Sequence, residues 1–474
     1  MRVLLVSPPH RYGSKSRVPT YLPLGLAYIA ACARDRGHHV QVLDAWAHDL
    51  SRGEVRERLA EMSWDVAGIS ALSTQYRYVK WVAAELKRLR PAPVVLGGAL
   101  ASFSPHIVLR ATEVDICVVR EGEATFVELL ENLDRRQHVP GIWHRTEDES
   151  HRNDAREPIE DLDALPFPAR DLFPQEVYLR HASLDPGRRT PRVTNVVTGR
   201  GCPYGCRYCS KVMRGLRLRS IDSVIEEVRA LIAEYQIGGI DFNDELLTVS
   251  KERAHELCDK IGPLGIGWQC QGRADVVDYQ LLRTMRRAGC VCVGFGVESG
   301  SQKILDAMNK GVTVEQSVAA VNAAMRAGLH VQIQMMFGYP GDDQHTLAET
   351  VAFAARLHDY AYRPSLFITT PLPGAPLYHR ARRDGLIPDE EGFLESLEAG
   401  YEPDGPVLVN MTQFSDEEFL RLKAETEARI GAALRRQLMT NPISMARYGV
   451  HRVRRDGAGQ VLRAVCRKVR RQAR

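Results

Sequence analysis

Three cysteines lie close together on a loop rich in glycine and proline. Cys202, Cys206 and Cys209 are separated by three and then two residues, and they follow the strand-like run Val193 to Val197. A structural zinc site needs a fourth Cys or His, usually from a second paired motif, and the chain has no other C-x2-C or H-x3-H pair. An iron–sulfur cluster held by three thiolates keeps one iron open to a small molecule. The spacing therefore favours a reactive cluster over a structural metal site.

The same residues carry a family resemblance. The pattern Cys202-x3-Cys206-x-Tyr208-Cys209 resembles the CxxxCxφC signature of the radical SAM superfamily, with Tyr208 at the aromatic position. The resemblance implies a [4Fe-4S] cluster on the three cysteines, with S-adenosylmethionine (SAM) on its open iron. An electron from a flavodoxin or ferredoxin would then cleave SAM to methionine and a 5′-deoxyadenosyl radical. Zinc or a chance spacing is the alternative.

Length and composition indicate a cytoplasmic enzyme of two or three domains. The chain has 474 residues, of which 44% are hydrophobic and 26% charged. It contains no run of eighteen apolar residues, so we expect no membrane span. The other seven cysteines are scattered, mostly in apolar runs, as is typical of buried thiols in a reducing compartment.

The basic character of the chain belongs to its end. The net charge is +4, but residues 441–474 contain ten Lys or Arg and one acidic residue, so the preceding residues carry a net charge of −5. This end could contact nucleic acid. A solvated tail is the simpler interpretation, and we expect a small-molecule substrate, with no nucleic-acid partner.

Residues 1–145 alternate short apolar strands with helices, which predicts a doubly wound, Rossmann-like sheet. The predicted strands and helices are Val3 to Val6, Val40 to Leu43, Val66 to Ile69, Val94 to Leu96 and Ile116 to Val119, and Leu24 to Arg36 and Tyr76 to Arg90. This region resembles the cobalamin-binding domain that precedes the barrel in one radical SAM subgroup. The matching segments are Pro23 to Tyr28, Gly37 to Val40, Gly97-Gly98 and Glu121 to Glu123.

Two loops of this domain depart from the subgroup. Its GGPHA loop is Gly97-Gly98-Ala99-Leu100-Ala101 here, and its GEGE loop begins with Arg120; a DxHxxG motif is absent. Because glycine lets a ligand approach the backbone closely, we expect these loops to close the crevice, so that the domain serves as a lid without corrinoid. In the alternative, His10, Leu100 and Arg120 are ordinary rim residues and cobalamin is bound.

The rest of the chain divides into three predicted regions. Residues 146–191 are a charged linker that resembles the subgroup's LDxLPxPA segment; residues 192–387 are the radical SAM core, a partial (β/α)6 TIM barrel; and residues 388–474 are a helical region, amphipathic from Phe414 to Leu438, that ends in the basic tail. In such barrels the site lies at the carboxyl ends of the strands.

Polar residues follow successive strands of this predicted barrel. Asn243, Asp244 and Glu245 follow one strand, at the place where the resemblance implies contacts to the methionine end of SAM. Glu298, in a GxESG segment, would bond to ribose hydroxyls or to the amino group of SAM. Gly338 and Pro340, in a GxPG loop, would let the adenine lie against the backbone. Arg273 follows a further strand, where it either faces the pocket or forms a salt bridge.

The resemblance leaves the outcome of hydrogen abstraction open. We expect a small, polar, sugar-like natural-product substrate, as in antibiotic biosynthesis, that loses water as in the aminoglycoside-type radical SAM diol dehydratases. A cobalamin-dependent radical SAM C-methyltransferase is the alternative. A tRNA-modifying enzyme fits less well, because the chain has neither a second cysteine triad nor a β-rich RNA-binding end. The sequence identifies no acid or base for the reaction.

Overall fold

The computed structural model describes residues 1–9, 21–147, 149–184, 192–213, 215–357, 364–400, 405–440, 442 and 445. His10 and the predicted basic tail lie outside these residues. The chain forms two compact units. The N-terminal unit comprises Met1–Ala182, Asn195–Glu227 and Thr370–Asn410; the barrel unit comprises Ser183–Thr194, Val228–Thr369 and Met411–Arg474. The segment with the three cysteines therefore packs in the N-terminal unit.

The N-terminal unit contains a seven-stranded sheet in the order β2-β1-β3-β4-β5-β6-β7. Its strands are β1 (Arg2–Ser7), β2 (His39–Asp44), β3 (Val66–Ser70), β4 (Val94–Gly97), β5 (Ile116–Val118), β6 (Ile142–Arg145) and β7 (Ser150–Arg152). The strands β1 to β5 pair in parallel, and β6 and β7 are antiparallel. The strand order reverses at β1, and the crevice at such a point is the usual ligand site of doubly wound sheets.

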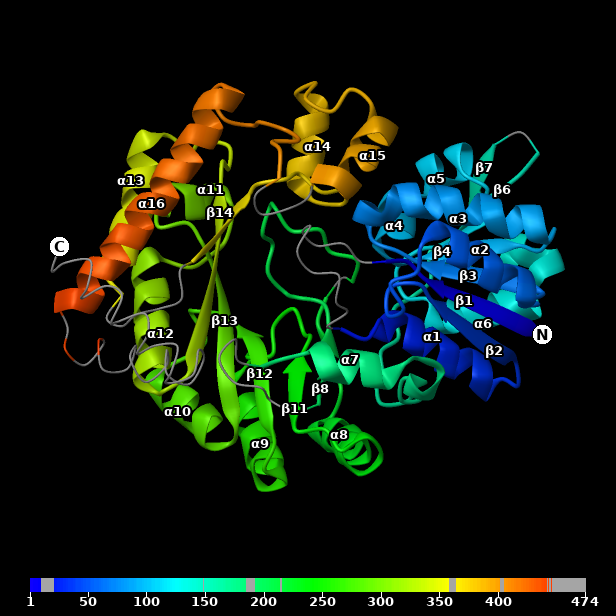
Figure 1. Cartoon of the computed structure of the whole chain (residues 1–474), viewed down its shortest axis with the longest axis horizontal. Coiled ribbons are helices and arrows are strands. Elements are labelled where there is room, and N and C mark those ends of the chain that lie inside the picture. Colours follow the sequence, from blue (N-terminus) through cyan, green and yellow to red (C-terminus); the bar gives the residue numbers. More distant parts are fainter. Residues whose placement is uncertain are drawn as a thin grey trace, which may run out of the picture. The chain divides into compact units, whose positions relative to one another are not determined.

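Helices cover this sheet, and further short elements belong to the same unit (Figure 1). They are α1 (Leu24–Asp35), α2 (Arg52–Glu61), η1 (Ser73–Gln75), α3 (Tyr76–Leu89), α4 (Gly98–Phe103), α5 (Pro105–Ala111), α6 (Glu123–Glu131), η2 (Leu133–His138), η3 (Arg170–Leu172), α7 (Gln175–His181), β9 (Gly199–Arg200), β10 (Arg217–Leu218), α14 (Pro376–Arg383) and α15 (Glu390–Gly400).

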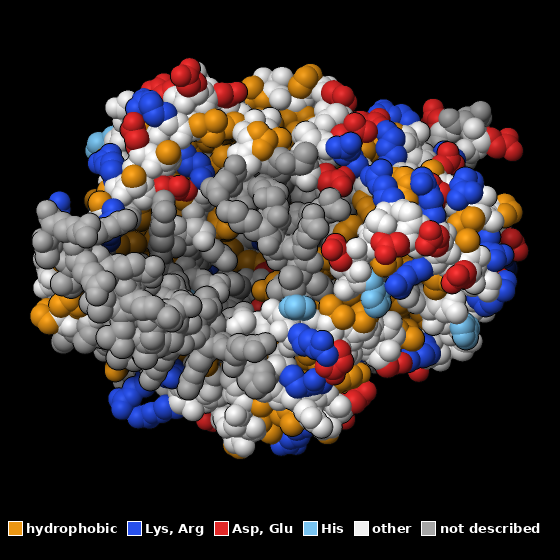
Figure 2. All heavy atoms as spheres, in the orientation of Figure 1, with side chains coloured by type: hydrophobic (Ala, Val, Ile, Leu, Met, Phe, Trp, Pro, Cys, Tyr) orange, Lys and Arg blue, Asp and Glu red, His pale blue; other side chains and the backbone are white. Residues whose placement is uncertain are grey.

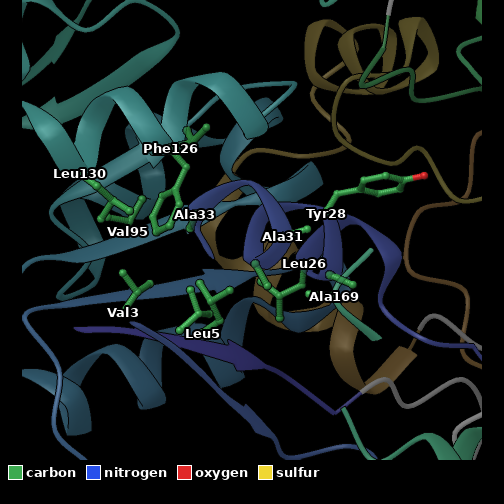
Figure 3. Packing of buried hydrophobic residues seen from close by; sticks show 14 of the residues in the cluster. Val3, Leu5, Leu26, Tyr28, Ala31, Ala33, Val95, Phe126, Leu130 and Ala169 are labelled. Atoms are coloured by element: carbon green, nitrogen blue, oxygen red, sulfur yellow. The ribbon is translucent and has the colours of Figure 1, made fainter. Parts of the chain in front are cut away.

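The core of the N-terminal unit lies between the sheet and the helices α1 and α6. Strand β1 contributes Val3 and Leu5, α1 contributes Leu26, and α6 contributes Phe126, all of them buried (Figure 3). The parallel strands are apolar on both faces, because helices cover both sides of such a sheet. The surface of the same unit carries Lys and Arg side chains interspersed with Asp and Glu (Figure 2).

The barrel unit is built on a second sheet, in the order β15-β14-β13-β12-β11-β8, and the chain passes between the two units within β8. Its strands are β8 (Val193–Val196), β11 (Gly239–Phe242), β12 (Gly267–Gly272), β13 (Cys290–Glu298), β14 (His330–Phe337) and β15 (Ser365–Ile368). The pairs from β11 to β15 are parallel. This is the parallel sheet of the predicted partial barrel.

Helices of the barrel unit lie on the outer side of its strands, as α9, α10 and α12 show (Figure 1). The helices are α8 (Ile221–Tyr235, which begins in the N-terminal unit), α9 (Lys251–Ile261), η4 (Gly262–Leu264), α10 (Tyr279–Arg287), α11 (Gln302–Ala307), α12 (Val314–Arg326), α13 (Gln344–Ala355) and α16 (Asp416–Thr440). Helix α16 packs against α13. None of the helices in the described ranges is long and apolar enough to span a membrane.

The segment predicted as a linker contributes more than spacing. Tyr178 in α7 is buried and donates a hydrogen bond to the buried carboxylate of Asp44, with 2.5 Å between the oxygens. Arg170 is also buried and pairs with Glu227 at 3.0 Å. These contacts could not be predicted from the sequence. The segment is mostly polar, and its few apolar residues follow neither a helical nor a strand period. The segment is part of the N-terminal core.

Candidate active site

The three cysteines lie on the loop between β9 and β10, which pair as an antiparallel hairpin. We call residues 201–216 the cysteine loop. Gly201 opens it with a φ of +82°, and a Cβ on this residue would lie 2.2 Å from the carbonyl oxygen of Gly215. Only glycine fits both the left-handed backbone and this close approach. The loop therefore closes on itself at its base.

The three thiols on this loop suit an iron–sulfur cluster in their chemistry. Cys202, Cys206 and Cys209 are partly exposed and form no disulfide. The backbone N–H of Cys209 bonds to the carbonyl of Cys206 at 3.4 Å, which brings the last two cysteines into one turn. Tyr208 lies within this turn and is half-buried. In the part of the chain that the structure describes, no three His, Cys, Asp or Glu side chains already form a metal site.

The cysteine loop rests on the segment that precedes and begins α14. The Ser210 hydroxyl donates to the carbonyl of Pro373 at 2.8 Å, and the N–H of Leu377 donates to the carbonyl of Arg207 at 2.9 Å. Gly374 in this segment packs on the ring of Phe103 in α4; a Cβ there would meet the ring at 2.3 Å. The segment from Pro371 to Gly374 and the start of α14 thus support the cysteine loop.

Two arginines attach the base of the cysteine loop to the N-terminal sheet. Arg200 bonds to Glu121 at 2.8 Å and to Glu123 at 2.6 Å, and Arg217 bonds to Glu121 at 2.7 Å. All four side chains are at most 12% exposed. The guanidinium of Arg200 also lies over the ring of Tyr28, 5.4 Å from its centroid. We call these four charged residues the arginine clamp.

Two members of the arginine clamp, Glu121 and Arg200, have pKa values shifted toward the charged form. Burial alone would raise the pKa of Glu121, but hydrogen bonds from Arg217 and Arg200 outweigh it and lower this pKa below its usual value. For Arg200, burial opposes the charged form, yet the carboxylates of Glu123 and Glu121 raise its pKa. The predicted GEGE-like loop therefore uses both of its glutamates to hold the cysteine loop.

In the barrel unit, the residues predicted to bind SAM follow the carboxyl ends of the strands. Asn243, Asp244 and Glu245 come directly after β11; Asp244 is buried, and Asn243 and Glu245 are exposed. The buried hydroxyl of Thr248 accepts a hydrogen bond from the N–H of Arg273 at 3.3 Å, which joins this turn to the end of β12. These positions suit a ligand at the strand ends.

Glu298 sits at the end of β13 in an unusual conformation. Its φ is +64°, and the pairing of β13 with β14 is irregular between Gly296 and Glu298. Its carboxylate is buried and bonds to the ammonium of Lys310 at 2.8 Å. A Cβ on Gly296 would lie 2.3 Å from that carboxylate, so the glycine of the GxESG segment provides its space. The resemblance predicts that Glu298 bonds to SAM. Within the chain, its carboxylate is paired with Lys310.

Arg273 forms the salt bridge that was one of its two predicted roles. Its Nε lies 2.7 Å from the carboxylate of Asp275, and it also donates to the carbonyl oxygen of Lys310. The side chain is 7% exposed. Arg273, Asp275, Lys310 and Glu298 thus form one polar network at the ends of β12 and β13, and Arg273 positions the segment that carries Lys310.

The GxPG loop after β14 is shaped by a carboxylate and an aromatic ring. The N–H groups of Gly338 and Tyr339 both donate to Asp342 at 3.0 Å. Burial raises the pKa of Asp342 to about 6, although hydrogen bonds from Thr346, Tyr339 and Gly338 oppose this. A Cβ on Gly338 would lie 2.2 Å from the ring of Phe419 in α16. Because Gly338 has no side chain, the ring of Phe419 can approach its backbone closely. Pro340, two residues later, is buried.

A cavity of about 430 Å³ lies within the N-terminal unit, and of the two altered segments only the second contributes to its wall, through Arg120. Ser102, Phe103, Val119 and Arg120 form part of its wall. Leu100 does not project into the space: it is fully buried, and its N–H bonds to the carbonyl of Ala71 at 3.1 Å. The expectation that the two altered segments close the crevice stays a prediction.

The comparisons with known proteins place the chain in a family. Residues 15–130 match the B12 binding domain, and residues 196–354 match the radical SAM superfamily. An uncharacterized methyltransferase of Pyrococcus horikoshii is 34% identical over 399 residues, which are 82% of this chain and 84% of that protein. The chain belongs to the radical SAM superfamily, in the group with a B12-binding domain.

Two further relatives show the breadth of this group. The anaerobic magnesium-protoporphyrin IX monomethyl ester cyclase of Rubrivivax gelatinosus is 29% identical over 75% of this chain and 65% of that protein. Among solved structures, the radical SAM methyltransferase TsrM of Kitasatospora setae, with cobalamin and a [4Fe-4S] cluster bound, has a TM-score of 0.66 and 20% identity over 81% of this chain and 75% of that chain. This likeness confirms the predicted fold class.

The predicted site residues divide between the two units. The cysteines and Tyr208 lie in the N-terminal unit, and Asn243 to Glu245, Glu298, Gly338 and Pro340 lie in the barrel unit. Their roles toward SAM stay predictions. The sequence analysis missed the residues that position them: Arg200, Arg217, Lys310 and Asp342. Two of these had a signal, since Arg200 and Arg217 flank the cysteine loop symmetrically and a buried arginine requires a carboxylate.

Proposed function

We propose that this protein is a cobalamin-dependent radical SAM methyltransferase that acts on a carbon of a small molecule. The observation that carries the proposal is the match of residues 15–130 to the B12 binding domain, next to a radical SAM match over residues 196–354. The methyltransferase from Pyrococcus horikoshii, related over most of both chains, supports the same reaction. The methyltransferase alternative thus has better support than elimination of water, the outcome first expected.

Each unit has its own part in this proposal. Cys202, Cys206 and Cys209 bind the [4Fe-4S] cluster, and the arginine clamp holds their loop against the N-terminal sheet. When bound, the cluster and corrinoid supply the electron that cleaves SAM and the methyl group that is transferred. The chain itself orients the cofactors and keeps water from the reacting carbon.

In the barrel unit, the proposed task is to bind SAM. Asp244 and its neighbours accept hydrogen bonds from the ammonium of its methionine end, and Glu298 bonds to ribose hydroxyls. The ammonium of Lys310 directs the Glu298 carboxylate and provides the partner that a buried carboxylate needs. The backbone of the Gly338 loop, fixed by Asp342, forms the surface for adenine.

The test compares the reconstituted protein with and without hydroxocobalamin, using SAM whose methyl group is deuterated, under a strong reductant. We expect S-adenosylhomocysteine to form only with corrinoid, because methyl transfer from SAM needs an acceptor, and 5′-deoxyadenosine to form in addition. Candidate amino-sugar substrates should gain a trideuterated methyl group. Loss of water from a substrate in cobalamin-free buffer, without S-adenosylhomocysteine, would contradict the proposal.

A further inference from the structure

The cavity in the N-terminal unit has a charge that its own side chains do not balance. Five cationic side chains line it, against two carboxylates. Arg382 pairs with Glu390 at 2.8 Å, and Arg156 pairs with Glu128 outside the cavity wall. The cationic side chains left over are Arg120, Arg152 and Lys211, with Asp154 as the remaining carboxylate.

Two of these cations have no carboxylate partner within ion-pair distance among the described residues. They are Arg120 and Arg152; the guanidinium of Arg152 lies 5.9 Å from the centroid of the Trp143 ring. The ammonium of Lys211 bonds to a neutral group, the carbonyl oxygen of Cys202, at 3.2 Å. Arg120 is half-buried, and Arg152 is exposed at the rim. Because guanidinium groups favour anions that accept several hydrogen bonds, the wall is suited to an anionic ligand.

Arg120 occupies a backbone position that favours glycine. Its φ is +67°, and its N–H bonds to the hydroxyl of Ser102 at 2.9 Å, which fixes this conformation. A left-handed backbone is costly for a residue with a Cβ and free of strain for glycine. Glycine would therefore make the fold more stable at this position. The Arg120 side chain forms no ion pair among the described residues that would offset the strain. A contact with a ligand accounts for its presence.

We propose that this cavity binds the phosphate monoester or phosphonate group of the substrate. Three cations against one carboxylate leave two positive charges, and a phosphate monoester carries about −1.5 to −2 near pH 7. A carboxylate or a phosphodiester, with one negative charge, would leave the wall unbalanced. The volume of about 430 Å³ is within the range of small-molecule sites. Trp143, Phe103 and Tyr378 provide apolar walls for the rest of the ligand.

The position of the cavity agrees with a substrate. Lys211 and Val212 line it and follow Cys209 by two and three residues, so the cavity borders the cysteine loop. A ligand anchored there by its phosphate lies next to the proposed cluster site. The inference that the ligand is the substrate rests on the proposed function, whereas binding of the anion does not depend on it.

The experiment measures binding of phenyl phosphate to the full-length protein by titration calorimetry, without SAM or reductant. Phenyl sulfate is the matched probe with a single negative charge. We expect phenyl phosphate to bind at least tenfold more tightly than phenyl sulfate, and Arg120→Gln and Arg152→Gln each to weaken it about tenfold, as for a charged hydrogen bond. Arg77→Gln, which changes an exposed arginine of α3, should have no effect.

Arg120→Gly separates a ligand role from a structural one. Glycine suits the left-handed backbone, so this variant should unfold at the same temperature as the parent protein or higher, and still lose phenyl phosphate. Unchanged affinity in the Arg120 and Arg152 variants would overturn the proposal. A second result would also overturn it: an Arg120→Gln protein that no longer binds hydroxocobalamin but still binds cobinamide, which lacks the nucleotide tail. The cavity would then bind the corrinoid's tail. Either result leaves the reaction with SAM testable by itself.

Discussion

At the residue scale, the pair of Glu298 and Lys310 is the most demanding feature of the barrel unit. Both side chains are 11% exposed, and the backbone of Glu298 is left-handed. Residues held in such conformations cluster at functional sites, where the surrounding structure compensates for the strain. The strained backbone directs the Glu298 carboxylate. This carboxylate was predicted from the sequence to contact SAM, and in the structure it pairs with Lys310.

Replacing Glu298 should affect stability and SAM cleavage together. Glu298→Ala removes the carboxylate that binds the buried ammonium of Lys310, which we expect to destabilise the protein by about 3 to 5 kcal/mol. Glu298→Gln retains an oxygen acceptor and should cost less, about 1 to 3 kcal/mol. Chemical unfolding measures both. If Glu298→Gln formed 5′-deoxyadenosine from SAM at the parent rate, the role of Glu298 toward SAM would be wrong.

Asp342 should make stability depend on pH. Its pKa is raised from 3.8 to about 6 by burial, so the native protein holds a proton that the unfolded chain releases between these values. The stability contributed by this group therefore falls as pH rises from about 4 to 6, by on the order of 2 kcal/mol. Asp342→Asn should remove this part of the curve. Urea midpoints of both proteins across this range check it, and parallel curves would contradict it.

At the scale of elements, the cysteine loop depends on one glycine. Gly201→Ala places a Cβ 2.2 Å from a carbonyl oxygen, whereas Gly215→Ala, at a φ of +72°, finds no atom within 4 Å. Both substitutions strain a left-handed backbone, at about 1 kcal/mol or more. Only Gly201→Ala also forces the loop base apart, so it should bind markedly less iron after reconstitution. Equal iron contents in the two variants would contradict this account of the loop.

The arginine clamp should control how firmly the loop is held. Arg200→Lys keeps the charge but loses the planar fork that reaches Glu121 and Glu123, so we expect a loss of about 1 to 3 kcal/mol and faster removal of iron by a chelator. Arg34→Lys is the control. It changes an exposed pair with Asp171, at about half exposure on both sides, and should cost less than about 1 kcal/mol. Equal losses of stability and equal rates of iron removal in the two variants would show that the arginine clamp does not hold the cysteine loop.

The elements themselves were largely predictable, and their contacts were not. The predicted strand Val3 to Val6 and helix Tyr76 to Arg90 match β1 and α3 closely, because apolar runs and a following proline mark their ends. The cysteine spacing identified the family for the same local reason. Arg200 with Glu121, or Glu298 with Lys310, join residues whose pairing depends on the fold, and charge alone does not select the partner.

The two altered segments of the N-terminal domain show most clearly where prediction from the sequence ends. Leu100 and Arg120 replace family residues, and by composition alone they would fill a crevice. In the structure Leu100 turns into the core and Arg120 stands beside an open cavity. Leu100 lies in α4 and Arg120 has a left-handed backbone. These local conformations set the direction of each side chain, and a substitution pattern does not give them.

At the scale of the whole molecule, the two units divide the proposed work. The N-terminal unit carries the cysteine loop and the B12-binding sheet, and the barrel unit carries the residues proposed for SAM. The cysteine loop and the strands and helices that match the B12 binding domain are different elements of the N-terminal unit. Cluster and corrinoid should therefore be lost independently.

The most direct test of the account is the cofactor content of protein reconstituted with iron, sulfide and hydroxocobalamin and then passed through gel filtration. We predict about four irons and one corrinoid per chain, by iron assay and by the corrinoid absorption bands. The triple variant Cys202→Ala, Cys206→Ala, Cys209→Ala should lose the iron and keep the corrinoid. A parent protein that keeps its iron while the corrinoid bands disappear on the column would contradict the central claim.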